Sequence, residues 1–126
     1  MEIKTALFDT CILIDYLNGI PHAADTLKEY AGNPAVSIIT WTEVMVGAAR
    51  LGDEQRRQTR HFLAQFMSVP ITEDIAAMAV AIRAKDGVKL PDAIIDATAR
   101  VTGRLLITRN VRDFKRNPRV LCPYAP

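Results

Sequence analysis

Residues 3–19 read IKTALFDTCILIDYLNG, and the order of features in this stretch decides the fold class. A short, apolar and β-leaning run over 3–8 stops at Asp9. The segment 11–17 then predicts a short helix that ends at Asn18, where the chain turns into Gly-Ile-Pro. A strand that passes directly into a helix is the first half of a strand–helix–strand unit, the building block of parallel sheets.

The same strand–helix order recurs along the rest of the chain. We expect one α/β domain over residues 1–126 with a mostly parallel central sheet. Thr40 or Thr42 is the expected N-cap of a helix that runs through Leu51. The expected strands cover 3–8, 35–39, 68–71, 104–108 and 119–121, the other expected helices cover 11–17, 22–31, 53–67, 73–85 and 91–102, and a loop or short turn covers 109–117.

Composition narrows the class of protein. A chain of 126 residues with 49% hydrophobic residues can bury a substantial core, and its net charge of +2 suits a polyanionic substrate better than a cationic one. Cys11 and Cys122 show neither metal-site spacing nor a disulfide framework, so we expect reduced thiols. No signal peptide and no membrane-spanning stretch is visible, which predicts a cytoplasmic protein without membrane contact. Phosphate-binding glycine motifs are also missing from the sequence.

Three acids interrupt apolar stretches of the sequence: Asp9, Glu43 and Asp92. Removing a lone carboxylate from water is costly, so acids in such surroundings need a partner. Each of the three follows a predicted strand or begins a helix that packs on the sheet, and sites in parallel sheets form outside the carboxyl ends of strands. We therefore expect these acids to share one edge with a bound Mg²⁺, whose preferred ligands are oxygens.

Each acid also has a structural explanation that needs no active site. Asp92 in the first turn of a helix can serve only the helix dipole, and Glu43 can close a capping box with Thr40. Asp9 can be an ordinary turn residue after a strand. Asp15 is interpreted as a solvated or locally bonded acid. These explanations do not account for the shared location of the first three acids.

Four segments of the chain, taken in order, resemble a known family. They are ALFDTCILIDYL (6–17), WTEVMVGA (41–48), LPDAIIDATA (90–99) and LLITRNVRDF (105–114). Together they are similar to the PIN-domain ribonucleases, specifically the VapC-type toxins of bacterial toxin–antitoxin modules. The resemblance implies an α/β/α sandwich, dependence on Mg²⁺ or Mn²⁺, and endonucleolytic cleavage of RNA that leaves 5′-phosphate and 3′-hydroxyl ends.

The resemblance also assigns roles to individual residues. Asp9, Glu43 and Asp92 match the metal-binding acids of the family, and the fourth family position falls on Asn110, where many relatives carry Asp. Asp113 resembles an acid that contributes to catalysis through water. Thr10 and Thr108 resemble the hydroxyls that line the site, and Asp96, four residues after Asp92, is an auxiliary candidate.

A mechanism and partners follow from these assignments. We expect Asp9 and Asp92 to hold the Mg²⁺ while Glu43 orients the attacking water. The basic residues after strand 104–108 are candidates for contacts with RNA phosphates, unless they form only a solvated basic loop: Arg109, Arg112, Lys115 and Arg116. The resemblance implies a cognate antitoxin, and apolar residues of helices 11–17 and 43–51 offer it a groove, unless they only fill the core. Homodimerisation would use other helices.

Two other functions fit part of the sequence. A phosphatase of the haloacid dehalogenase type uses an Asp after its first strand as nucleophile, but it needs a second Asp two residues later, where this chain has Cys11. A catalytically silent module that only binds RNA or a partner would keep the acids without using them. Trapping of phosphate on Asp9 would favour the phosphatase, and metal-dependent RNA cleavage that is lost in Asp9→Asn would exclude the silent module.

Overall fold

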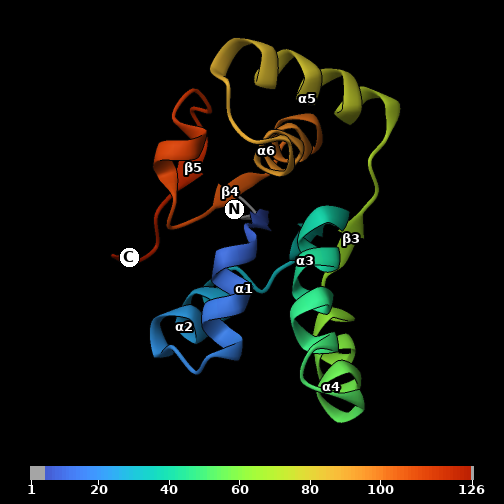
Figure 1. Cartoon of the computed structure of the whole chain (residues 1–126). Helices are drawn as coiled ribbons and strands as arrows, with labels where there is room; N and C mark the ends of the chain where they lie inside the picture. The colour runs from blue at the N-terminus through green and yellow to red at the C-terminus, as the bar shows by residue number, and fades with distance from the viewer. Residues whose placement is uncertain (1–4, 126) are drawn as a thin grey trace.

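The computed structural model describes residues 5–125, and it has a five-stranded parallel sheet covered by helices on both faces (Figure 1). The strand order is β3-β2-β1-β4-β5, so β1 is central. The strands are β1 (Ala6–Phe8), β2 (Ala35–Ser37), β3 (Met67–Val69), β4 (Leu105–Ile107) and β5 (Val120–Leu121). The helices are α1 (Thr10–Leu17), α2 (Pro21–Glu29), α3 (Ile38–Ala49), α4 (Asp53–Leu63), α5 (Glu73–Asp86), α6 (Leu90–Thr102) and the short 3-10 helix η1 (Val111–Phe114).

Alternate residues of β1 point into two separate cores, which makes the fold a three-layer α/β/α sandwich. Leu7 belongs to a core closed by α5, α6 and η1, whereas Ala6 and Phe8 belong to a core closed by α1 to α4. Figure 1 shows the same division, with α5 and α6 on one side and the first four helices on the other. Because side chains alternate along a strand, a strand buried on both faces reads as a continuous apolar run, as ALF does here. The predicted fold class is confirmed.

The turn from β2 into α3 differs from the prediction. The strand predicted over 35–39 ends at Ser37, whose side-chain oxygen accepts a hydrogen bond from the Ile39 amide at 3.1 Å. Ser37 is therefore the N-cap, and the prediction of Thr40 or Thr42 in this role was wrong. Ile38 and Ile39 are β-branched and apolar, so the sequence favours an extended strand at the place where Ser37 in fact starts a helix.

The other elements lie close to their predicted ranges, except that the helix predicted over 53–67 ends at Leu63, and Met67 already belongs to β3. The predicted strand 3–8 is observed from Ala6, and residues 3 and 4 lie outside the described part of the chain. The strand predicted at 68–71 ends before Pro70, which has no amide hydrogen to donate to a neighbouring strand. The segment 109–117 contains η1, and β5 forms the predicted edge strand. Within residues 5–125, no helix is both long enough and apolar enough to cross a bilayer.

Candidate active site

Asp9 lies at the carboxyl end of the central strand and is the N-cap of α1. The residue is 4% exposed, and its Oδ1 accepts a hydrogen bond of 2.8 Å from the Thr10 amide, one of the free amides of the first helical turn. Its Oδ2 accepts a bond of 2.7 Å from the Thr108 hydroxyl at the end of β4. Burial raises the pKa of Asp9, these hydrogen bonds oppose the rise, and the charge of Glu43 adds to it.

Glu43 reaches the same edge from α3. Its Oε1 accepts a hydrogen bond of 2.7 Å from the Thr10 hydroxyl, and the Thr40 hydroxyl oxygen lies 3.0 Å from the same Thr10 oxygen. The sequence suggested that Glu43 lies in the first turn of the helix and in apolar surroundings. It is instead the sixth residue of α3 and is exposed. The capping box with Thr40 does not form, because Ser37 caps the helix. Its bond to Thr10 joins α3 to the residue next to Asp9.

Asp92 enters from the first turn of α6 and shows that the acids converge. Its pKa is raised from 3.8 to about 6, first by burial and then by the negative charges of Asp9, Asp113 and Glu43, while Lys89 acts in the opposite direction. Coulomb interactions weaken with distance, so the acids that act on Asp92 lie near its carboxylate. The structure therefore brings together, at one sheet edge, acids that are up to 104 residues apart in the sequence.

The oxygen-rich edge suits a hard divalent cation without forming a complete cage for it. In the described residues, no group of three or more His, Cys, Asp or Glu side chains stands ready to hold a metal ion. Asp9 and Glu43 are instead hydrogen-bonded to threonine hydroxyls. Mg²⁺ keeps several waters and is usually bound through one or two carboxylates, so it does not need a cage made only of protein. Burial and then the charges of the neighbouring acids raise the pKa of Asp92, and a bound cation would offset the charge repulsion in this shift.

The segment after β4 forms the other wall of the site. Thr108 donates to Asp9 and also accepts a hydrogen bond of 2.9 Å from the Asn110 amide. Asn110 and Asp113 are exposed, and the Asp113 amide donates to the Asn110 carbonyl at 3.0 Å, which starts η1. Residues 109–113 line a hollow of about 390 Å³ beside the acids.

Asp96 does not join the other acids. It is 2% exposed, and its Oδ1 accepts hydrogen bonds of 2.9 Å from both Arg100 Nε and Asn117 Nδ2. Its carboxylate thus holds α6 to the segment that follows η1. These contacts give Asp96 a structural explanation, and its proposed auxiliary role at the site has no support from its position.

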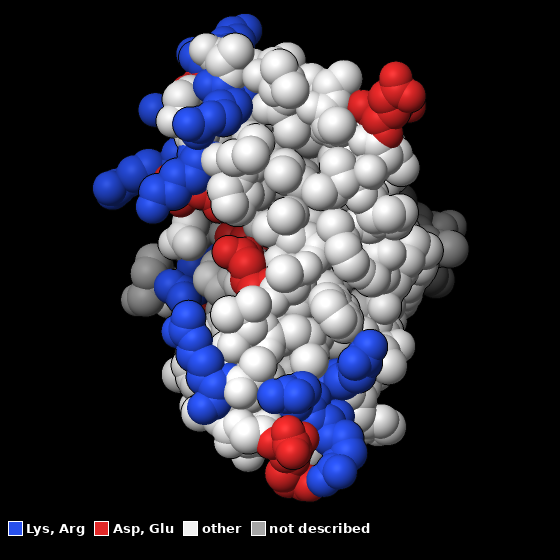
Figure 2. Space-filling model, turned by 45° about the vertical axis from the view of Figure 1, so that its right-hand side comes forward, with Lys and Arg blue, Asp and Glu red and all other residues white. Residues whose placement is uncertain are grey.

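Two of the four basic candidates for RNA contacts are engaged within the protein. Arg109 forms a bidentate pair with Asp15, at 2.5 Å and 3.1 Å, and Arg116 pairs with Asp86 at 2.5 Å. Arg112 and Lys115 are exposed. Figure 2 shows a small acidic group near the middle of one face, with basic side chains above and below it. A polyanion can approach the acids only if such basic groups, or a cation, offset their charge.

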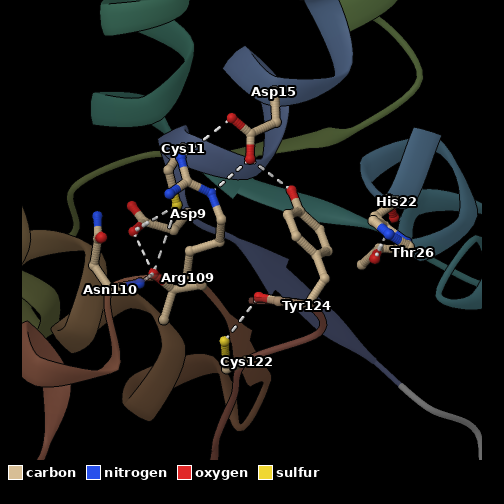
Figure 3. Close-up of polar contacts among 10 residues, drawn as sticks. Asp9, Cys11, Asp15, His22, Thr26, Arg109, Asn110, Cys122 and Tyr124 are labelled. Atoms are coloured by element: carbon tan, nitrogen blue, oxygen red, sulfur yellow. Dashed lines mark hydrogen bonds and ion pairs between the residues drawn. The ribbon is translucent and has the colours of Figure 1, made fainter. Parts of the chain in front are cut away.

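Asp15 was interpreted wrongly from the sequence. Its side chain is 15% exposed, and besides Arg109 it accepts a hydrogen bond of 2.7 Å from the Tyr124 hydroxyl, near the C-terminus (Figure 3). The bond to Asp15 raises the pKa of Arg109, and burial, reinforced by Asp15, raises the pKa of Tyr124. In the sequence, the apolar neighbours of Asp15 in 11–17 were the only sign that this acid has a partner.

Cys11 lies beside the acids without the properties of a nucleophile. Its Sγ is 3.5 Å from Asp9 Oδ2 and 3.7 Å from Thr108 Oγ1. Burial and the charge of Asp9 raise its pKa to about 11, so the thiol is protonated at neutral pH. Cys11 and Cys122 are both free, as the sequence predicts.

An apolar groove lies between the helices that the sequence predicted to form one, 11–17 and 43–51. It encloses about 210 Å³ between α1, α3 and α4, and Leu51 at its margin is 72% exposed. The lining residues are Ile14, Leu17, Asn18, Val44, Gly47, Ala48, Leu51, Gln55 and Thr59.

Comparisons with known proteins agree on one family. The family model of the PIN domain matches residues 6–120. Ribonuclease VapC19 and Ribonuclease VapC10 of Mycobacterium tuberculosis are each 32% identical to the chain, over 94% of its length and 98% and 92% of theirs. A solved toxin–antitoxin complex from Klebsiella pneumoniae contains a chain that is 46% identical, with a TM-score of 0.90, over 96% of this chain and 99% of that one. VapBC from Salmonella typhimurium, bound to DNA, shares the fold at 21% identity and a TM-score of 0.75.

Proposed function

The chain belongs to the PIN-domain family, and from that premise we propose that it is a divalent-metal-dependent endoribonuclease that acts as the toxin of a toxin–antitoxin pair. The observation that supports the proposal is the position of the acids at the carboxyl edge of the sheet: Asp9 is bonded to Thr108 and to the Thr10 amide, Glu43 is bonded to the Thr10 hydroxyl, and Asp92 lies in the first turn of α6, where Asp9, Glu43 and Asp113 act on its charge. Relatives that are matched over nearly their full length are named ribonucleases, and the 46% identical neighbour comes from a toxin–antitoxin complex. We propose the cytoplasm as its compartment, which agrees with two free cysteines.

We propose that Asp9, Asp92 and Glu43 hold the cation, with Mg²⁺ or Mn²⁺ as the ion. When bound, such a cation offsets the charge that develops on the phosphate oxygens and makes water a better nucleophile. Asp9 is held in one orientation by Thr108 and by the Thr10 amide, so its carboxylate is positioned before any ligand arrives. Glu43 is exposed and hydrogen-bonded to Thr10, a position from which it can orient an attacking water.

The RNA contacts follow from which basic side chains are free to make them. We assign Arg112 and Lys115 to flanking phosphates, since both are exposed and leave the site on the same segment as Asp113. Arg116 is a weaker candidate because Asp86 already pairs with it. The neutral amide of Asn110 faces solvent beside the acids and leaves the fourth family position without charge.

We propose that an antitoxin segment binds in the groove between α1, α3 and α4 and that the toxin forms a homodimer through another face. The groove is apolar, and Leu51 and Leu17 at its margin are exposed in the isolated chain. On α5, Val80 is 67% exposed, which suits contact between two copies. Leu51→Glu should weaken antitoxin binding at least tenfold, measured by titration calorimetry, and light scattering of the toxin alone tests the dimer.

Incubation of the purified, antitoxin-free protein with total RNA tests the nuclease proposal. We expect cleavage with Mg²⁺ or Mn²⁺, none with EDTA, and new 5′-phosphate ends that can be mapped by ligation and sequencing. Asp9→Asn and Asp92→Asn should abolish cleavage, whereas Asp53→Asn on α4, whose side chain is 91% exposed, should retain it. A folded wild-type protein that cuts no RNA with any divalent metal would overturn the proposal. Phosphate trapped on Asp9 would point to the phosphatase chemistry instead.

A further inference from the structure

The turn between β4 and η1 is fixed by contacts on both of its sides. On one side, Thr108 donates to Asp9 at 2.7 Å and accepts the Asn110 amide at 2.9 Å. Arg109 lies between these two residues, and its side chain reaches Asp15 on α1 (Figure 3). The backbone adds two bonds at the same level, from the Asp9 amide to the Ile107 carbonyl and from the Thr108 amide to the Leu121 carbonyl.

We propose that Asp15 is a positioning residue for the active site, acting through Arg109 on the turn formed by Thr108, Arg109 and Asn110. The inference rests on the proposed nuclease function. Asp9 and Asp15 are six residues apart, and α1 begins directly after Asp9. The helix is thus attached to the end of β4 at two points, through the Asp9–Thr108 bond and through the Asp15–Arg109 pair. Two attachments fix the orientation of α1 relative to the turn, which one bond cannot do.

The pair has the features of an ion pair that fixes geometry. Both nitrogens of the Arg109 fork engage the two oxygens of Asp15, and the side chains are only 24% and 15% exposed. Bidentate pairs with little solvent exposure are stronger and more directional than surface pairs. Tyr124 donates to the same Asp15 oxygen that accepts Arg109 Nε, so the C-terminal segment supports the carboxylate as well. Tyr124 in turn stacks on His22 of α2, with ring centroids 5.8 Å apart.

The same geometry argues against a role for Arg109 as a phosphate ligand. A guanidinium that binds RNA must leave Asp15, and Asp15 would then keep an uncompensated charge at a mostly buried position. Arg112, three residues further along, is exposed and offers a contrast in the same segment. The two roles predict different kinetics. A lost positioning residue lowers kcat, whereas a lost phosphate contact weakens RNA binding and its dependence on salt.

The experiment compares Asp15→Asn, Arg109→Gln and the double variant, with Arg112→Gln as the contrast. Arg57→Gln is the matched control, because Arg57 pairs with Glu54 on the exposed surface of α4. For Asp15→Asn and for Arg109→Gln, we expect kcat to fall about 10- to 100-fold with KM changed less than about threefold, since small misplacements of catalytic groups have effects of this size. The double variant should be no worse than either single variant, and Arg109→Lys, which keeps the charge but loses the fork, should fall in between.

A readout independent of cleavage is the hydrogen exchange of the Asn110 amide, which bonds to Thr108. It should exchange at least about tenfold faster in Asp15→Asn and Arg109→Gln than in the wild type, and at the wild-type rate in Arg57→Gln. The inference is overturned if Asp15→Asn keeps the wild-type kcat and the wild-type exchange rate of the Asn110 amide. It is also overturned if Arg109→Gln behaves as expected of Arg112→Gln, with a higher KM and a slope of log affinity against log salt concentration that is lower by about one. If the wild type cuts no RNA, the proposed function fails, while the exchange data still decide whether the pair positions the turn.

Discussion

Replacing Asp92 by asparagine should stabilise the metal-free protein at neutral pH while it abolishes RNA cleavage. Burial and the charges of Asp9, Asp113 and Glu43 raise the pKa of Asp92 from 3.8 to about 6. The ionised carboxylate is less stable in the folded protein than in the unfolded chain, so ionisation of Asp92 opposes folding. Asparagine has nearly the same shape and removes the charge. The acid that the proposed chemistry requires is therefore one that destabilises the metal-free fold.

The size of the effect follows from the shift. A rise from 3.8 to about 6 corresponds to about 3 kcal/mol of opposition to folding, because one pKa unit is about 1.4 kcal/mol. Asp92 is only partly buried, and solvent screening reduces this figure to about 1–2 kcal/mol. Asparagine also loses about 0.5 kcal/mol of favourable interaction with the N-terminus of α6. A net gain of about 1 kcal/mol raises Tm by about 4 °C for a domain of this size.

The gain should depend on pH in a defined direction. Between about pH 4 and pH 6 the folded protein holds the Asp92 proton and the unfolded chain releases it, so the wild type loses stability as the pH rises through this window. Below about pH 4 the acid is protonated in both states, and the substitution has no charge to remove. The stability difference between Asp92→Asn and the wild type should therefore be near zero at pH 4 and complete at pH 7.

Thermal and urea unfolding in EDTA at pH 4 and pH 7 measure this difference. Asp53→Asn is the matched control, because Asp53 also lies in the first turn of a helix but is 91% exposed, so it reports the helix-dipole contribution together with a weak exposed ion pair to Arg56. Added Mg²⁺ should raise the Tm of the wild type more than that of Asp92→Asn, since a ligand stabilises the state that binds it. The reasoning is refuted if Asp92→Asn is no more stable than Asp53→Asn at pH 7.

Three further outcomes test the contacts around the site. Thr108→Val should cost about 2 kcal/mol of stability in urea unfolding and lower the initial cleavage rate at least tenfold, since it removes the donor to Asp9; cleavage at the wild-type rate would contradict this. Asp96→Asn should cost about 2–3 kcal/mol because it breaks a buried pair, while the dependence of cleavage on Mg²⁺ stays as in the wild type. Iodoacetamide should modify exposed Cys122 well before Cys11, whose pKa is about 11, in a time course followed by mass spectrometry. Modification of Cys11 as fast as or faster than Cys122 would contradict this.

The sequence predicts the mostly parallel α/β sheet because it depends on local patterns, whereas the three-layer sandwich was implied by the resemblance to the PIN-domain family. Strand–helix alternation, the glycines that end α5 and α6 at positive φ, and the apolar period of α5 are all visible within short windows. The start of α3 was missed because two local preferences compete there. Ile38 and Ile39 favour a strand, while Ser37 accepts the Ile39 amide and starts a helix, and only the packing of the helix decides between them.

Pairs of residues far apart in sequence explain most of what was missed at the site. Asp15 and Arg109 are 94 positions apart, and Asp96 and Asn117 are 21 apart, so no local window shows that either acid has a partner. Asp15, like Asp9, is an acid among apolar residues, but a short helix near the surface also offers an acid a solvated position, so the two environments look alike in the sequence.

The net charge at the sheet edge connects these observations to function. Asp9, Glu43, Asp92 and Asp113 carry negative charge, and Lys89 is the cation that acts on Asp92. Arg109 follows β4 directly, but its charge is balanced by Asp15, so it contributes orientation to the edge rather than neutralisation. In the proposed function, a divalent cation and basic side chains such as Arg112 would offset the repulsion among these acids. The uncharged Asn110 limits this repulsion at the family's fourth position. In the proposed nuclease, such an edge would couple metal binding to the stability of the fold and would leave exposed basic groups such as Arg112 for the RNA substrate.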